Sequence, residues 1–217
     1  MPDPAPPKHR QHADHSLSRS ILATSQKGPP YAELHCKTNY SFLRAASHPD
    51  ELVQTAAELG YRALAVTDRN SLAGVVRAHG AARQVDLKLL IGAEVTPMDA
   101  PAVVLLATDR AAYGRLASLL TLGKRRAPKG ECHLTFDDVA SHAEGLLACV
   151  PLSGIVQTDS TDTLYDYRDA FPRRCYTLAE LHLGPDDART LEQMQAIARR
   201  VGLPLVAAND VHYHVPE

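Results

Sequence analysis

Seven short apolar segments recur along the chain, and amphipathic segments of helical period separate most of them. The apolar segments predict strands at residues 32–36, 62–67, 88–93, 103–107, 146–150, 175–181 and 204–208. The amphipathic segments predict helices at residues 48–59, 71–84, 110–120 and 136–143, and a last one that ends at Gly202. Short apolar strands that alternate with helices are typical of a parallel sheet covered by helices. The pattern therefore predicts an α/β fold of the parallel barrel type.

Composition is consistent with one folded domain and excludes several classes. Of 217 residues, 45% are hydrophobic, which is enough for a real core, and the net charge of −2 gives no overall attraction to nucleic acid. The glycine-rich and nucleophile motifs GxGxxG, P-loop and GxSxG do not occur, so the sequence gives little support to a nucleotide-binding Rossmann fold. Four cysteines without a CxxC pair, no apolar run long enough to span a membrane and no signal-peptide core predict a cytoplasmic protein with reduced thiols and no membrane contact.

The two ends of the chain differ from the domain between them. Residues 1–30 hold six of the fifteen prolines and almost no apolar residues, which predicts a disordered leader before a domain at residues 31–217. The chain stops five residues after His212, with no helix to cover the last strand. This predicts a piece of a longer polypeptide.

A basic segment, Lys124–Gly130, is predicted to be a loop. It has two interpretations, contact with a phosphate backbone or a solvated loop. The second is favoured, because no aromatic side chain is interleaved with the charges.

Residue types that bind metals follow successive predicted strands. They are His35, Asp68, Glu94, His182, Asp210 and His212. In a parallel barrel the carboxyl ends of all strands lie at one end, so these six side chains are expected to converge there. Histidine and carboxylate sets of this kind hold divalent ions that activate water and bind phosphoryl oxygens. The spacing thus predicts a metal centre, or the remains of one.

Four ordered motifs carry a resemblance to a known family. They are residues 33–43, 65–68, 91–94 and 208–214. Together they resemble the PHP (polymerase and histidinol phosphatase) domain. Residues 31–217 are most similar to the N-terminal PHP domain of bacterial DNA polymerase III alpha-type subunits of the error-prone branch. The resemblance implies a distorted seven-stranded (β/α) barrel.

Three positions depart from the family's pattern, because Lys37, Asn39 and Arg69 stand where the resemblance implies ligands. Lysine and arginine offer no lone pair and carry positive charge. Beside Glu94 and Asp210 they would neutralise the carboxylates and repel a divalent cation. The prediction is a degenerate site rebuilt as a salt-bridge network. The alternative is that Lys37 and Arg69 point into solvent and one Zn, Mn or Fe ion still binds.

The resemblance also implies a function. It indicates the N-terminal part of an error-prone, translesion DNA polymerase that acts in replication and repair of damaged DNA and uses Mg²⁺. The replaced ligands favour a structural and interaction module within that parent, without chemistry of its own. The implied partners are the remainder of the polymerase chain, DNA through that parent, a sliding clamp and mutagenesis accessory proteins. One alternative is an active metal-dependent phosphoesterase or 3′–5′ exonuclease. Another is a free-standing PHP phosphatase that acts on a small phosphate ester.

Overall fold

The computed structural model describes residues 29–158 and 161–215. Its chain divides into two units, Met1–Pro30 and Tyr31–Glu217, and every helix and strand named below belongs to the second. The predicted leader at residues 1–30 lies almost wholly outside the described residues. Among the described residues, no helix is long and apolar enough to cross a membrane.

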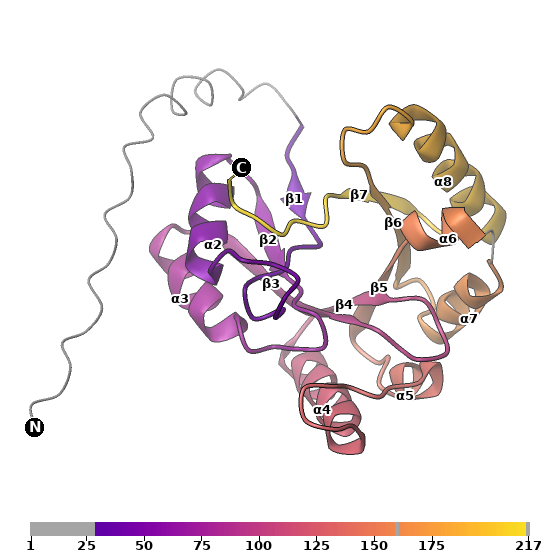
Figure 1. The fold of residues 1–217 in the computed structure, drawn as a ribbon, viewed down its shortest axis with the longest axis horizontal. Coiled ribbons are helices and arrows are strands. Elements are labelled where there is room, and N and C mark those ends of the chain that lie inside the picture. The colour runs from indigo at the N-terminus through magenta and orange to yellow at the C-terminus, as the bar shows by residue number, and fades with distance from the viewer. Residues whose placement is uncertain (1–28, 159–160, 216–217) are drawn as a thin grey trace, which may run out of the picture. The chain divides into compact units, whose positions relative to one another are not determined.

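The second unit consists of strands that alternate with helices (Figure 1). The strands are β1 (Ala32–Glu33), β2 (Ala63–Val66), β3 (Lys88–Val95), β4 (Val103–Ala107), β5 (Leu146–Pro151), β6 (Cys175–Glu180) and β7 (Leu205–Ala208). The helices are α2 (Pro49–Glu58), α3 (Val75–Gln84), α4 (Arg110–Arg126), α5 (Phe136–Ser141), α6 (Ser153–Thr158), α7 (Asp162–Ala170) and α8 (Asp187–Val201). All seven predicted strands are present, each within three residues of its predicted bounds.

The seven strands pair in chain order, from β1 to β7, and the sheet nearly closes on itself. A parallel bridge between Cys36 and Val211 joins the two ends: the Lys37 N–H donates to the Val211 carbonyl at 2.8 Å, and the Val211 N–H donates to the His35 carbonyl at 2.9 Å. The buried Glu33 carboxylate reinforces this closure, since it accepts from the backbone N–H groups of His35 and Asn209. The predicted distorted seven-stranded barrel is thus confirmed.

One strand runs against the prediction of a parallel sheet. β4 is antiparallel to both β3 and β5, whereas the other neighbouring pairs are parallel. Parallel neighbours need a crossover of a dozen or more residues, and the connection at residues 96–102 is too short for one. The chain therefore reverses direction between β3 and β4.

The helices also correct the sequence prediction at three places. α6 and α7 were not expected, because the sequence of α7 is rich in aspartate and tyrosine and buries only Leu164 and Tyr167. α4 continues to Arg126, so Lys124, Arg125 and Arg126 form its last turn rather than a loop. Cations stabilise the carboxyl end of a helix, which explains the extension.

Apolar side chains fill the inside of the barrel. One buried cluster gathers residues from five strands, namely Ala65, Val104, Leu106, Cys149, Leu178 and Ala208. A larger cluster packs α4, α5, α7 and α8 against the outside of the sheet, and a third packs α2 and α3 against β2. Because the interior is packed, polar groups can gather only at a barrel end.

Candidate metal centre

A buried cluster of charged side chains lies where β1, β3, β6 and β7 reach the carboxyl end of the barrel. Its members are His35, Lys37, Glu94, Glu180 and Asp210, and we call them the ion-pair cluster. His35 and Lys37 follow β1 at spacing two, so both side chains share a face. Asp210 follows β7 with a φ of 48°, a left-handed conformation in which its side chain contacts Lys37.

His35 is the hub of the ion-pair cluster. Its Nδ1 lies 2.6 Å from Glu180 Oε1, and its Nε2 lies 3.0 Å from Glu94 Oε2 and 3.5 Å from Asp210 Oδ1. Its side chain is 3% exposed. Both ring nitrogens thus face carboxylates, an arrangement that favours the doubly protonated ring.

The ammonium group of Lys37 is the second cation of the ion-pair cluster. Its Nζ lies 2.7 Å from Glu94 Oε2 and donates a hydrogen bond to Asp210 Oδ1. It is also 3.0 Å from His35 Nε2, a contact between like charges that the surrounding carboxylates compensate. The side chain is only 6% exposed, so the ammonium group lies among the carboxylates rather than in solvent.

Arg69 adds a third positive charge at the edge of the ion-pair cluster. Its backbone pairs with Glu94, and its guanidinium Nε lies 4.0 Å from Glu94 Oε1. The side chain is 37% exposed, so this ion pair is partly screened by solvent and weaker than those of Lys37. Three carboxylates therefore face one buried ammonium, one buried imidazolium and one peripheral guanidinium.

The pKa values reflect this mutual stabilisation. Burial by itself lowers the pKa of His35, but hydrogen bonds with Glu180 and Glu94 outweigh it and raise the pKa from 6.5 to about 9. Burial by itself raises the pKa of Glu94, but His35 and Lys37 outweigh it and lower the pKa from 4.5 to about 2. In the same way the pKa of Asp210 falls and that of Lys37 rises. All four groups are charged at neutral pH.

Three members of the ion-pair cluster also have the geometry of a ligand set. His35, Glu180 and Asp210 each offer a ligand atom, and these atoms lie within 4.8 Å of one another. The Lys37 ammonium group opposes this use, because it lies 3.0 Å from His35 Nε2, donates to Asp210 Oδ1 and offers no lone pair to a metal.

Asp68 lies at a strand end as expected, but its carboxylate is engaged elsewhere. It accepts hydrogen bonds from the Thr38 N–H at 2.8 Å, the Thr38 hydroxyl at 2.9 Å and the Ser41 hydroxyl at 2.7 Å. The residue is fully buried, and Gly74 leaves room for it: a Cβ there would lie 2.7 Å from Asp68 Oδ2. Asp68 therefore anchors the loop at residues 38–48.

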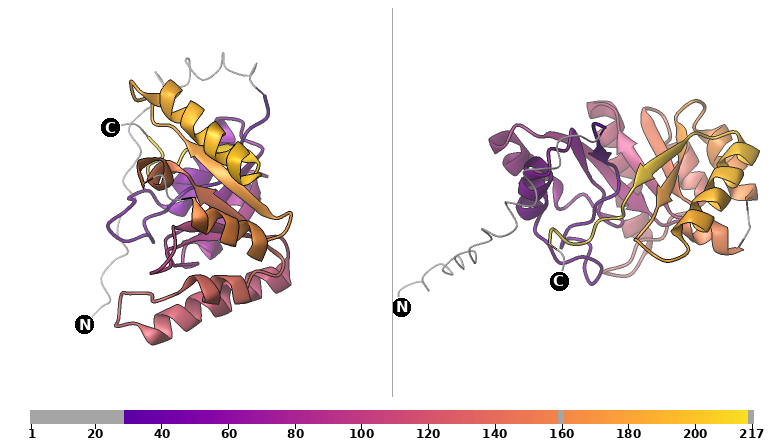
Figure 2. Two further views of the ribbon diagram at one scale, coloured as in Figure 1. Left: turned by 90° about the vertical axis from the view of Figure 1, so that its right-hand side faces the viewer. Right: turned by 90° about the horizontal axis from the view of Figure 1, so that it is seen from above.

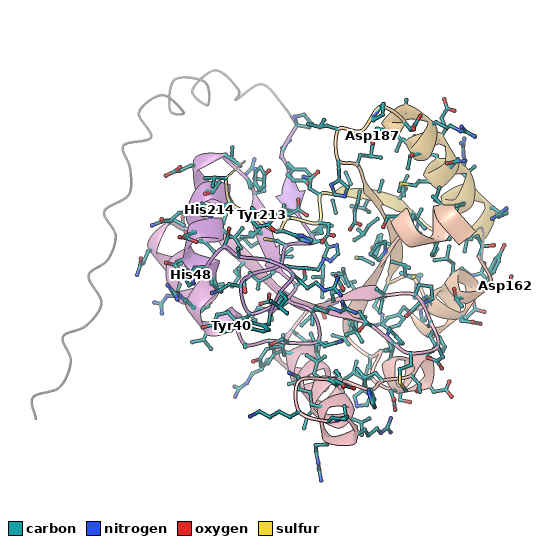
Figure 3. The ribbon with its side chains drawn as sticks, viewed as in Figure 1. Tyr40, His48, Asp162, Asp187, Tyr213 and His214 are labelled. Atoms are coloured by element: carbon teal, nitrogen blue, oxygen red, sulfur yellow. The ribbon has the colours of Figure 1, made fainter. Side chains whose placement is uncertain are left out.

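The remaining predicted residues lie outside the ion-pair cluster or at its edge. His212 contributes at the edge, with Nε2 3.2 Å from Asp210 Oδ1. His182 is exposed, and no hydrogen bond or ion pair among the described residues joins it to the cluster. The amide of Asn39 donates to His48 Nδ1 at 2.9 Å, and His214 Nδ1 lies 2.8 Å from the Ser47 hydroxyl. Figure 3 shows His48 and His214 beside α2.

Sequence reasoning missed Glu180, which occupies the place expected for His182. The two residues are spaced by two, so they would share a face if the strand continued. β6 ends at Glu180, however, and the chain turns at Leu183, which has a φ of 58°. Alternate residues along 175–181 share a face of the strand, and Glu180 is the last strand residue on its face. The sequence could therefore have indicated Glu180, if the strand end had been placed there.

Comparison with known proteins identifies the family. A family model described as PHP domain matches residues 33–177, about two thirds of the chain. The chain belongs to the PHP domain family. The resemblance seen in the sequence motifs is thereby confirmed.

Curated relatives of this PHP domain are much longer proteins. An error-prone DNA polymerase of Rhodopirellula baltica is 46% identical over 202 residues, and one of Aromatoleum aromaticum is 52% identical over 191 residues. The matches cover 86% of this chain in both cases, but 17% and 18% of the respective relatives. The chain thus spans about a sixth of the length of these polymerases.

Two solved structures share the fold. A putative metal-dependent phosphoesterase from Bifidobacterium adolescentis has a TM-score of 0.64 at 17% identity, covering 86% of this chain and 89% of that one. An amidohydrolase from Chromobacterium violaceum, described with bound sulfate and no metal, has a TM-score of 0.63 at 17% identity, covering 83% and 87%. At this identity the likeness concerns the fold alone.

Proposed function

We propose that this PHP domain is the N-terminal part of an error-prone, translesion DNA polymerase and serves it as a structural and interaction module without chemistry of its own. Residues 31–217 would form the module, with residues 1–30 as a leader. The names and lengths of the curated relatives support the parent. Through that parent the module would act in the cytoplasm in repair and replication of damaged DNA. Its partners would be DNA, a sliding clamp and mutagenesis accessory proteins, with Mg²⁺ serving the polymerase site.

The observation that carries the proposal is the place of the Lys37 ammonium group. It lies between Glu94 and Asp210 and against His35, inside the set of atoms that a divalent ion would need. An ammonium group offers no lone pair and repels a second cation over this distance. The residues as arranged therefore do not fit a metal ion, and we interpret the ion-pair cluster as a degenerate metal site.

The loop at residues 38–48 supports an interaction role. Asp68 anchors its base, while Phe42 and Leu43 at its tip are 83% and 88% exposed. Leu43 has a φ of 61°, a conformation that costs a leucine free energy without any compensating burial in this chain. We assign this tip to contact with the polymerase body, whose length in the relatives far exceeds that of the module.

Elemental analysis of the purified chain tests the degenerate site. We expect less than one tightly bound Zn, Mn or Fe per chain, and two or more equivalents that survive dialysis would contradict the proposal. Lys37→His with Arg69→His should raise metal uptake, because two cations leave and two ligands return. Asn39→Asp is the matched control, since its amide contacts His48 rather than the cluster. No gain in the double variant would mean that these positions do not limit metal binding.

A second candidate is an active metal-dependent phosphoesterase or 3′–5′ exonuclease. The proximity of ligand atoms on His35, Glu180 and Asp210 favours it. The assay supplies Mn²⁺ or Zn²⁺ with single-stranded DNA and with a generic phosphate ester. The module proposal expects no turnover above background. Turnover that metal stimulates and His35→Ala abolishes would establish the second candidate instead.

A further inference from the structure

Helix α4 has an unusual charge composition for this chain. Its 17 residues include five cations, Arg110, Arg115, Lys124, Arg125 and Arg126, and no aspartate or glutamate. The whole chain has 23 basic and 25 acidic residues, so the helix stands apart from an almost balanced composition. Figure 2 shows α4 along the outer edge of the folded unit. All five cations except the half-buried Arg115 are exposed.

Only some of these charges are neutralised. Arg115 pairs with Glu144 at 2.8 Å, and Arg126 pairs with Asp138 at 2.6 Å. Lys124, Arg125 and Lys129 are exposed, and within the described part of the chain none of them forms an ion pair. We call these three residues the basic tip. The helix dipole accounts for cations in the last turn, but its effect does not extend to Lys129, three residues beyond the helix.

A groove of about 730 Å³ lies beside the basic tip, between α4 and the end of α5. It is lined by Ala117, Leu122 and five polar residues of types that can hydrogen-bond to phosphate, namely Ser118, Thr121, Arg125, Arg126 and His142. Within the chain the Thr121 hydroxyl donates to the Ala117 carbonyl, and Arg126 pairs with Asp138. His142 donates from Nδ1 to the Asp138 carbonyl at 2.8 Å, which fixes its ring at the groove wall. The groove thus holds hydroxyl groups, an imidazole and the unpaired guanidinium of Arg125, beside the two other cations of the basic tip.

The basic tip lies near the end of the barrel that carries the ion-pair cluster. The His133 N–H donates to the Gly123 carbonyl, and the Met98 N–H donates to the Leu134 carbonyl. These contacts join the segment after α4 to the segment that leaves the carboxyl end of β3. These contacts hold Gly123, the residue before the basic tip, against the segment at residues 133–134.

We propose that the basic tip and its groove bind the phosphate backbone of DNA without sequence preference. The positive charge of the basic tip and the hydrogen-bonding groups of the groove favour a polyanionic ligand. The choice of DNA as that ligand rests on the proposed polymerase parent. None of the residues that line the groove is Phe, Tyr or Trp, so the proposed contact is to phosphates. It replaces the solvated loop favoured from the sequence, because Arg125 stands in the last turn of a helix and lines this groove. The attraction between this surface and the phosphates would strengthen the binding of DNA that passes over the module.

Fluorescence anisotropy with labelled single-stranded and duplex DNA tests the proposal on the 217-residue chain, at about 0.05 M and 0.2 M salt. We expect binding that weakens with salt and at least a tenfold loss of affinity in Lys124→Glu/Arg125→Glu. The neutral variant Lys124→Gln/Arg125→Gln should reduce the salt slope by about 0.7 per lost contact with single strands and about 0.9 with duplex. Arg83→Glu/Lys88→Glu is the matched control, with the same change of charge at an exposed arginine in the last turn of α3 and an exposed lysine at the start of β3.

Three outcomes would overturn the proposal. One is unchanged DNA affinity in both double variants, with thermal melting that shows each to be folded. Another is an equal loss in Arg83→Glu/Lys88→Glu, which would indicate a diffuse charge effect. The third is tip-dependent binding to anionic phosphatidylserine vesicles without binding to DNA. Each leaves the metal content of the chain unaffected, so failure here is distinguishable from failure of the degenerate-site proposal.

Discussion

Replacing Lys37 by methionine isolates the contribution of the buried ammonium group to stability. Methionine keeps much of the apolar stem of the side chain, while Glu94 and Asp210 lose their cation in a buried setting. The side chain of Glu94 is only 11% exposed, so little solvent screening replaces the lost partner. We expect the free energy of unfolding of Lys37→Met to fall markedly at neutral pH.

The lowered pKa of Glu94 gives an estimate of how much unfolding free energy Lys37→Met should lose. A fall from 4.5 to about 2 corresponds to about 3 kcal/mol of stability at neutral pH, at about 1.4 kcal/mol for each tenfold change in acidity. His35 and Lys37 share that effect, and Asp210 adds a further contribution through Lys37. Removing one partner of a buried ion pair costs about 3–5 kcal/mol in other proteins. We therefore expect a loss of about 2–4 kcal/mol.

Urea unfolding in the presence of a chelator measures this loss. The matched control is Lys88→Met, the same change at an exposed lysine at the start of β3. The carboxylates have depressed pKa values, so their contribution is present above pH 4.5 and disappears as the pH falls towards 2. The difference between wild type and Lys37→Met should shrink over that range. A loss no larger than that of Lys88→Met at neutral pH would refute the buried ion-pair argument.

Two further predictions concern the hub and the anchored loop. The pKa of His35 is raised to about 9 mainly by its hydrogen bond to Glu180, so imidazole resonances followed by NMR should titrate near pH 9 in wild type and at lower pH in Glu180→Gln. Because that pKa is raised, the stability from the imidazolium should be complete below pH 6.5 and lost as the pH rises through 9; an unchanged titration in the variant would assign the rise to other groups. Gly74→Ala should lower the melting temperature, because its Cβ would lie 2.7 Å from Asp68 Oδ2, with a cost of about 1–3 kcal/mol. Gly80→Ala, whose Cβ would meet nothing within 4 Å, should be neutral or stabilising. Equal melting temperatures of the two variants would show that the loop at residues 38–48 can shift to accommodate the added methyl group.

The sequence by itself determined the strand pattern and the family. Local apolar patterning depends on nearby residues only, so all seven strands were predictable from it. The polar residues at strand ends were equally visible, because a strand end is marked by the loss of that pattern. His35, Glu94 and Asp210 could therefore be proposed as neighbours, although about 175 residues separate the first from the last.

Tertiary structure alone decided how these residues are used. The direction of β4 depends on a short connection, and the choice of Glu180 over His182 depends on where β6 stops. Asp68 could be recognised as a loop anchor only once Thr38 and Ser41 were placed beside it. Most of all, a sequence gives the charge of Lys37 but not the direction of its side chain. That direction follows from closure of the barrel, which brings Asp210 from the far end of the chain against the ammonium group.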